Sequence, residues 1–169
     1  MTISSFLILG LAAGCSQPAV TGPDSQTQEG NGVKSHGALR VEGASLCDEN
    51  GNPVVLRGMS SHGISWYPRY LNGGAMKTLK EYGANLFRIA AYTEPSGAYL
   101  ENPDRTLDYL YMGAESALAE DLYVILDWHI LNDSDPNEHI EEAKDFFDQL
   151  SAHYADEPGI LYEICNEPN

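Results

Sequence analysis

The sequence has few basic residues. Its 169 residues include 9 Lys and Arg against 25 Asp and Glu, which gives a formal net charge of −16. A surface of this sign repels nucleic acid and anionic lipids, so we expect no nucleic-acid partner and favour a neutral or cationic one. The more ordinary role of such acidity is to keep the protein soluble.

Cysteine and long apolar runs are also scarce. Cys15, Cys47 and Cys165 are the three cysteines, too few for a disulfide scaffold. We expect Cys47 and Cys165 to be buried small residues and not a pair, because one falls in an N-terminal hairpin and the other near the far end of a strand. No stretch reaches the ~20 apolar residues of a membrane-spanning helix.

The N-terminus lacks Lys and Arg before Lys34 but has a short apolar core, Phe6–Ala13, followed by Gly14 and Cys15. This pattern resembles a bacterial lipoprotein signal, although the usual basic start is missing. It predicts a signal peptide over residues 1–14 and lipid attachment to Cys15, and an ordinary cleaved secretion signal is the alternative. Both predict an exported protein: an outer-membrane or cell-surface lipoprotein, or a secreted one.

Residues 15–36 are predicted to be a flexible linker, since residues 16–35 are mostly Pro, Gly, Ser, Thr, Gln, Asn and Asp. Ordered structure is expected from about Gly37. Leu39–Val41 and Ser45–Cys47 are predicted to be the short strands of an N-terminal hairpin, and Asp48–Asn52 a turn.

The remaining chain alternates between short apolar runs and helical patterns. The runs lack polar alternation, which is typical of strands buried on both faces of a parallel sheet: Val54–Met59, Asn85–Ala91, Tyr123–Trp128 and Ile160–Cys165. Three helices are expected between them, on apolar positions spaced by three and four: Ala75, Leu79 and Tyr82; Leu107, Leu110, Ala114 and Ala117; Ile140, Ala143, Phe147, Leu150 and Tyr154. A cap at Asp135, with Pro136 and Glu138, predicts where the third helix begins.

This alternation predicts the α/β class and a (β/α)₈ TIM barrel. Such a barrel typically needs about 250 residues, so residues 37–169 supply about the first four of its βα units, after the hairpin. A doubly wound sheet is the structural alternative. It would usually carry a glycine-rich phosphate loop after the first strand, and Ser60–Gly63 is not one.

Every predicted strand ends in polar or aromatic side chains, and in a barrel these ends share one rim where active sites lie. The candidates are His62, Trp66, Tyr67, Arg88, Tyr92, Asp127, His129, Asn166 and Glu167. Each one alone is also compatible with a structural role; their common position favours a site. Arg88 lies in an apolar strand and needs a carboxylate partner in either case. His62 and His129 have no partner at a metal-motif spacing, so we predict no metal.

Four blocks in this order resemble glycoside hydrolase family 5, most closely the bacterial endoglucanases of its subfamily 2. The blocks are Leu56–Gly63 with Trp66 and Tyr67, Phe87–Thr93, Val124–Asp133 and Tyr162–Asn169. The resemblance covers the chain from about residue 37 to its end. It implies a retaining enzyme with two catalytic carboxyl groups about 5–5.5 Å apart.

The resemblance also implies roles for individual residues. Glu167 matches the family's acid/base carboxylate, and Asn166 the amide that holds the sugar 2-hydroxyl. Arg88 matches the arginine that supports the nucleophile. The remaining matches bind substrate: His62, Tyr92 and His129 line the subsite where the bond is cut, Trp66 is an aromatic platform, and Tyr67 lies beside it.

The nucleophile of this family is a glutamate at the end of the seventh strand, which would lie beyond Asn169. Glu163 is no substitute, because it precedes Glu167 by four residues on the same strand. Asp127 lies before the rim and is expected to be a structural partner of a histidine or the backbone. We therefore expect this chain to be the N-terminal part of the enzyme, inactive alone.

The implied function is hydrolysis of β-1,4-glucan in cellulose or a related polysaccharide by an endo-acting enzyme without metal or organic cofactor. The catalytic domain is expected to be monomeric. Two alternatives stay open. The protein is a β-mannanase or xyloglucanase of the same family, or it is a non-catalytic carbohydrate-binding protein built on a degenerate barrel.

Overall fold

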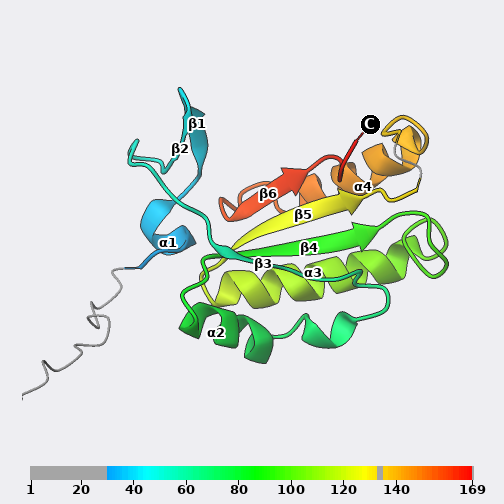
Figure 1. The fold of residues 1–169 in the computed structure, drawn as a ribbon, viewed down its shortest axis with the longest axis horizontal. Coiled ribbons are helices and arrows are strands. Elements are labelled where there is room, and N and C mark those ends of the chain that lie inside the picture. The colour runs from blue at the N-terminus through cyan, green and yellow to red at the C-terminus, as the bar shows by residue number, and fades with distance from the viewer. Residues whose placement is uncertain (1–29, 133–134, 169) are drawn as a thin grey trace, which may run out of the picture.

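The computed structural model describes residues 30–132 and 135–168. The predicted signal peptide, Cys15 and the first part of the predicted linker lie outside the described residues. The centre of the fold is a parallel sheet with the strand order β3-β4-β5-β6 (Figure 1). These strands are Gly58–Ser60, Leu86–Tyr92, Tyr123–His129 and Ile160–Glu163.

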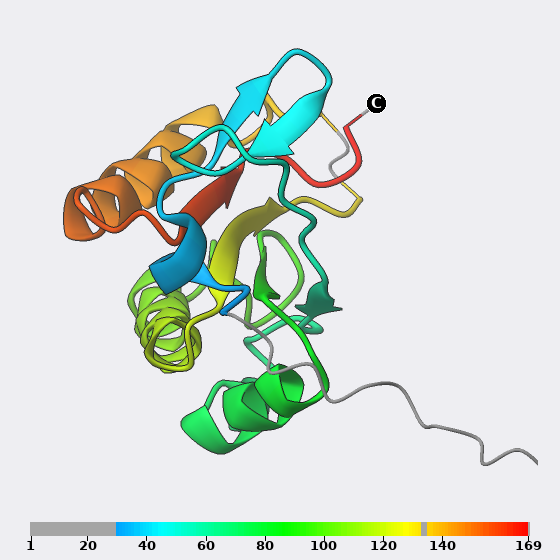
Figure 2. The ribbon, with the colours of Figure 1, turned by 90° about the vertical axis from the view of Figure 1, so that its left-hand side faces the viewer.

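One helix connects each pair of neighbouring strands. α2 is Gly73–Glu81, α3 is Pro103–Ala119 and α4 is Ile140–His153, and a short 3₁₀ helix, η1, spans Pro68–Tyr70. Figure 2 shows the three α-helices along one side of the curved sheet. Neighbouring parallel strands in chain order, with their helices on one face, are the arrangement of a barrel wall. No helix within the described ranges combines the length and hydrophobicity of a membrane span.

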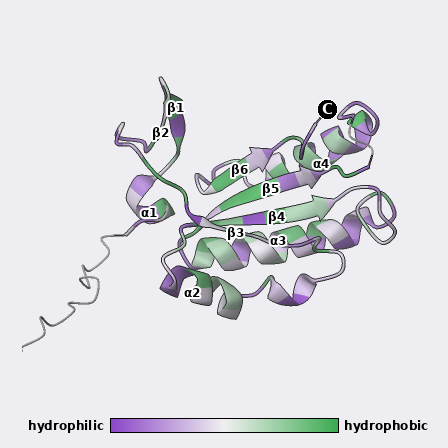
Figure 3. Ribbon diagram, viewed as in Figure 1, coloured by the Kyte–Doolittle hydropathy of each residue, from purple (hydrophilic) through white to green (hydrophobic). Residues whose placement is uncertain are grey.

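The core lies between the sheet and these helices. Side chains alternate across a strand, so Val124, Leu126 and Trp128 of β5 face the helices and are buried. Figure 3 shows that the first half of β5 is hydrophobic and that hydrophilic residues follow toward its end. The Trp128 ring contacts Tyr99 and Phe146 edge-on, with centroids 5.2 and 5.1 Å apart. The other side of β5 therefore remains for the polar residues of the sheet.

A hairpin of β1 (Arg40–Glu42) and β2 (Ser45–Cys47) lies at the N-terminal ends of the sheet strands (Figure 1). The predicted turn follows it and is organised by Asp48. This buried carboxylate accepts the backbone N–H groups of Asn50 and Asn52 at 2.9 and 2.8 Å. These hydrogen bonds, led by the Asn52 N–H, lower the pKa of Asp48 to about 2.

The folded part of the chain begins before Gly37, inside the segment predicted to be linker. Val33–His36 form a short helix, α1. The N–H of Lys34 donates to Asp121 at 2.8 Å, and the Asn85 amide donates to the Asn31 carbonyl at 3.0 Å. Composition missed this segment because hydrogen bonds to the barrel, and not apolar burial, hold it in place.

Two strands are shorter than their apolar runs. Val54–Met59 was expected to be a strand, but β3 is Gly58–Ser60. The Asn85 side chain takes the place of a strand partner: its oxygen accepts the Arg57 N–H at 2.7 Å and its amide donates to the Val55 carbonyl at 3.1 Å. β6 ends at Glu163, where Cys165 was expected.

Helix α4 begins later than predicted. Asp135 caps a separate turn, since its carboxylate accepts both the backbone and the side-chain N–H of Asn137 at 2.9 Å. The helix itself begins at Ile140 without a side-chain cap. Two apolar positions that were expected to face the core are not fully buried. Phe146 is fully buried in place of Phe147, and Tyr82, which follows α2, is 88% exposed.

Candidate active site

A layer of ion-paired side chains lies on the side of the sheet away from the helices, below the aromatic rings at the strand ends. The Arg88 guanidinium from β4 donates Nε and Nη2 to the two carboxylate oxygens of Glu163, both at 2.7 Å. Its Nη2 is also 2.8 Å from Asp127 Oδ2. This confirms that Arg88 has carboxylate partners, and the hydrogen bonds to Glu163 raise its pKa further.

Asp127 is the buried centre of this layer, with no exposed side-chain area. Burial raises the pKa of its carboxyl group, while the hydrogen bond with His129 and the charge of Arg88 oppose that rise. His129 Nδ1 lies 2.6 Å from Asp127 Oδ2. The expectation that Asp127 is a structural partner of a histidine is therefore confirmed, and Nδ1 is held toward the carboxylate.

A second layer, nearer the C-terminal strand ends, consists of aromatic rings. Tyr92 stacks on His129 with ring centroids 4.1 Å apart and planes 5° from parallel. Trp66 meets Tyr92 edge-on at 5.4 Å, and His62 lies 5.7 Å from Tyr92 and 5.2 Å from Tyr67. The structure thus brings all five of these predicted residues into one cluster around Tyr92.

Gly63 makes this packing possible. A Cβ atom at Gly63 would overlap the Trp66 ring and lie 3.3 Å from Tyr92. Its backbone N–H donates to His62 Nδ1 at 2.8 Å, so in the neutral ring the proton is on Nε2. Trp66 remains 39% exposed, which leaves a flat apolar surface open to a ligand.

Asn166 and Glu167 follow β6 at the same rim. The backbone N–H of Asn166 donates to the Trp128 carbonyl at 3.2 Å, and its amide donates to the Ile130 carbonyl at 3.1 Å. Its Oδ1 accepts from Arg88 Nη2 at 3.2 Å. Glu167 is exposed and has the positive φ of 43°, so the chain turns sharply there.

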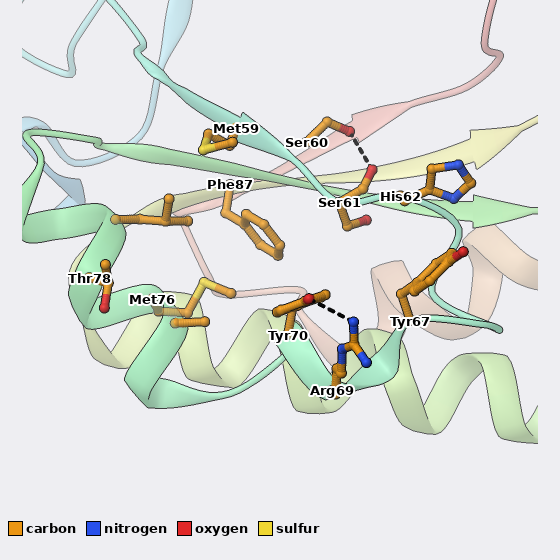
Figure 4. Close-up of a pocket in the computed structure, with 12 residues that line it drawn as sticks. Met59, Ser60, Ser61, His62, Tyr67, Arg69, Tyr70, Met76, Thr78 and Phe87 are labelled. Atoms are coloured by element: carbon orange, nitrogen blue, oxygen red, sulfur yellow. Dashed lines mark hydrogen bonds between the residues drawn. The ribbon is translucent and has the colours of Figure 1, made fainter.

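A cavity of about 570 Å³ lies beside this cluster and not within it (Figure 4). It opens between β3 and α2, where Met76 and Phe87 line its apolar part. His62 and Tyr67 lie at one end of it, next to the aromatic cluster (Figure 4). The carboxylate of Glu167 and the amide of Asn166 do not line this cavity, so the rim is the better candidate for chemistry.

The described residues contain no group of three or more His, Cys, Asp or Glu arranged to hold a metal ion. His62 and His129 both contact Tyr92, and His129 is committed to Asp127 through Nδ1. Cys47 is buried as expected and lies in the hairpin, whereas Cys165 is only partly buried and directly precedes Asn166. The Cys47 thiol donates to the Ser45 carbonyl at 4.0 Å, and that of Cys165 to the Asn166 carbonyl at 3.7 Å.

Sequence reasoning left Glu163 out of the site, although it holds the arginine there. Two features of the sequence pointed to it. Arg88 needs a carboxylate partner, and the alternation of side chains places Glu163 of β6 on the same side as Asp127 of β5, its partner in register. Neither signal chooses between these carboxylates, and both bind Arg88.

A parallel barrel wall whose strand ends carry a carboxylate, an amide and aromatic rings fits the class of barrel glycosidases. The family model for cellulase (glycosyl hydrolase family 5) matches residues 47–169. The chain belongs to this family, as its sequence blocks predicted.

The chain is 41% identical over 151 residues to an endoglucanase of Clostridium saccharobutylicum, covering 89% of this chain and 34% of that protein. It is 40% identical to the solved catalytic domain of Thermobifida fusca endoglucanase Cel5A (E5), with a TM-score of 0.79, covering 83% of this chain and 46% of that one. A variant of that domain has been solved with cellotetraose. The chain thus spans about a third of the curated relative's length, and the predicted partial (β/α)₈ fold is confirmed.

Proposed function

We propose that these residues belong to a retaining endo-β-1,4-glucanase that hydrolyses cellulose or a related β-glucan, with Glu167 as acid/base. The observation that carries this proposal is the shared rim: Asn166, next to Glu167, is tied to Arg88, and the rings of Tyr92 and His129 lie beside it. The cellotetraose bound to a variant of the Thermobifida fusca relative supports a β-glucan as the substrate.

In the proposed reaction Glu167 donates a proton to the leaving glycosidic oxygen, and a second carboxylate attacks the anomeric carbon. Water then hydrolyses the glycosyl-enzyme, with Glu167 as base. The Asn166 amide donates a hydrogen bond to a sugar hydroxyl, and Trp66 stacks on a pyranose ring. No metal or organic cofactor takes part in these steps.

We propose that the nucleophile is supplied by chain beyond Asn169. The Asp127 side chain has no exposed area, and Glu163 precedes Glu167 by four residues on the same segment, so we assign the nucleophile to neither. The chain of residues 1–169 should therefore show no hydrolysis of carboxymethylcellulose. Turnover by this purified chain that Glu167→Gln abolishes would contradict this.

The decisive experiment compares the full-length protein with its Glu167→Gln variant on cello-oligosaccharides. We expect kcat to fall on the order of 10³-fold, because a general acid contributes about that much. Proton NMR of the first product should show the β-anomer, as retention requires. An α-anomer would refute the mechanism, and binding without turnover would favour the carbohydrate-binding alternative.

We also propose export, with lipid attached to Cys15. The Gly14-Cys15 pair after an apolar core supports this. Cells fed labelled palmitate should incorporate it into the protein, and Cys15→Ser should abolish the label. Export with no label in the unaltered protein would favour an ordinary secretion signal.

A further inference from the structure

The Arg88 guanidinium has a fixed orientation, and Glu163 sets it. Two parallel hydrogen bonds of 2.7 Å join Nε and Nη2 of Arg88 to the two Glu163 oxygens. Such a bidentate, charge-assisted pair constrains the plane of the guanidinium as well as its position. Glu163 thereby decides where the remaining N–H groups of Arg88 point.

Those N–H groups connect the site's strands. Nη1 lies 3.2 Å from Ser60 Oγ on β3, and Nη2 lies 3.2 Å from the Asn166 side-chain oxygen after β6. Asp127 Oδ2 on β5 lies 2.8 Å from the same Nη2 as an ion-pair partner. Arg88 therefore connects Glu163 to the amide beside Glu167.

These contacts allow the Asn166 amide only one orientation. Its oxygen faces Arg88 and its nitrogen faces the Ile130 carbonyl, at 3.2 and 3.1 Å. A flipped amide would set donor against donor at Arg88 and oxygen against oxygen at Ile130. The second amide hydrogen has no acceptor among the described residues, so Asn166 offers a ligand a donor.

We propose that Glu163 is a positioning residue of the active site: by holding Arg88, it fixes the Asn166 amide with a hydrogen-bond donor for the substrate. This rests on the proposed function. The substrate group that this amide recognises is an acceptor, such as a hydroxyl oxygen. A purely structural ion pair would affect stability without affecting Asn166.

Kinetics of the full-length protein test the proposal, with variants Glu163→Ala and Glu163→Gln. We expect Glu163→Ala to lower kcat about 100-fold, the cost of a small misplacement of a substrate-positioning group. Glu163→Gln keeps one acceptor for Arg88 and should lose about tenfold, with KM within about threefold in both variants. The matched control is Glu141→Gln, which breaks an exposed pair with Lys144 and should leave kcat unchanged. A kcat within twofold of wild type for Glu163→Ala would overturn the proposal.

A second measurement needs no hydrolysis and separates this proposal from the proposed function. In ¹⁵N-labelled protein, the Arg88 Nε–H should exchange slowly with water, and the Asn166 amide hydrogens should give two well-separated signals. Glu163→Ala should shift both sets of signals, Glu163→Gln should shift them less, and Glu141→Gln should not. If the Asn166 signals do not change in Glu163→Ala, the positioning role is refuted, even if the enzyme is active. If they shift in a protein without activity, positioning stands and the proposed function fails.

Discussion

At the scale of single residues, Gly63 controls the aromatic cluster, because only a missing side chain lets the Trp66 ring lie over the backbone there. We expect Gly63→Ala to push Trp66 outward and to raise the fraction of tryptophan fluorescence quenched by acrylamide. The other tryptophan, Trp128, is buried at 1% exposure and should not respond. Gly73→Ala is the matched control, since a Cβ there meets nothing within 4 Å. It should leave quenching unchanged, and it should change stability little because Gly73 is the first residue of α2.

Loss of Arg88 should also lower stability. Arg88→Met leaves the fully buried Asp127 and the partly buried Glu163 without their cation. Removing one partner of such a cluster should lower the free energy of unfolding by about 3 kcal/mol. Lys144→Met removes the cation of an exposed pair and should cost less than about 0.5 kcal/mol. Urea unfolding with equal m-values measures both, and equal losses would contradict the interpretation.

At the scale of elements, the turn after β2 should make stability depend on acid. Its Asp48 has a pKa of about 2 in the fold and about 3.9 unfolded, so it stabilises the fold above pH 4. That contribution is lost as pH falls toward 2. Asp48→Asn keeps an acceptor for the turn but cannot titrate. The stability difference between wild type and Asp48→Asn should therefore shrink between pH 5 and pH 2, and a constant difference would argue against it.

Strand and helix order followed from the sequence because burial dictates it. Leu107, Leu110 and Ala114 of α3 are buried as their spacing predicted. The start of β3 did not follow, because the Asn85 side chain, distant in sequence, satisfies the backbone of Val55 and Arg57. Local spacing carries no information about such a partner.

The site, too, was predictable from the sequence only in part. The polar strand ends predicted His129 and Asn166 on one rim, and Asn166 donates hydrogen bonds to the Trp128 and Ile130 carbonyls on either side of His129 in the chain. The pairing of Arg88 with Glu163 depends on the register between β6 and β5, which sets Asp127 opposite Glu163. That register cannot be read from the sequence of either strand alone.

At the scale of the whole molecule, the described sheet has two outer strands, since β3 pairs only with β4 and β6 only with β5 among residues 30–132 and 135–168. Exposed apolar side chains lie at both edges: Met59 on β3 is 62% exposed, and Ile164 after β6 is 75% exposed. Unpaired edges of this kind template association with other chains. We expect the purified 169-residue chain to associate at concentrations on the order of 10 μM.

The double variant Met59→Lys with Ile164→Lys should suppress this association, because charged side chains on an edge oppose pairing with another strand. The control is Tyr82→Lys with Met112→Lys, which changes the net charge equally at exposed apolar positions just after α2 and on α3, away from any strand. Because added lysines bring the charge of −16 closer to zero, charge alone would favour association in both variants. Sedimentation velocity over a concentration series separates the two effects. If the control disperses the chain as well as the edge variant does, association comes from general surface hydrophobicity and not from the open strands.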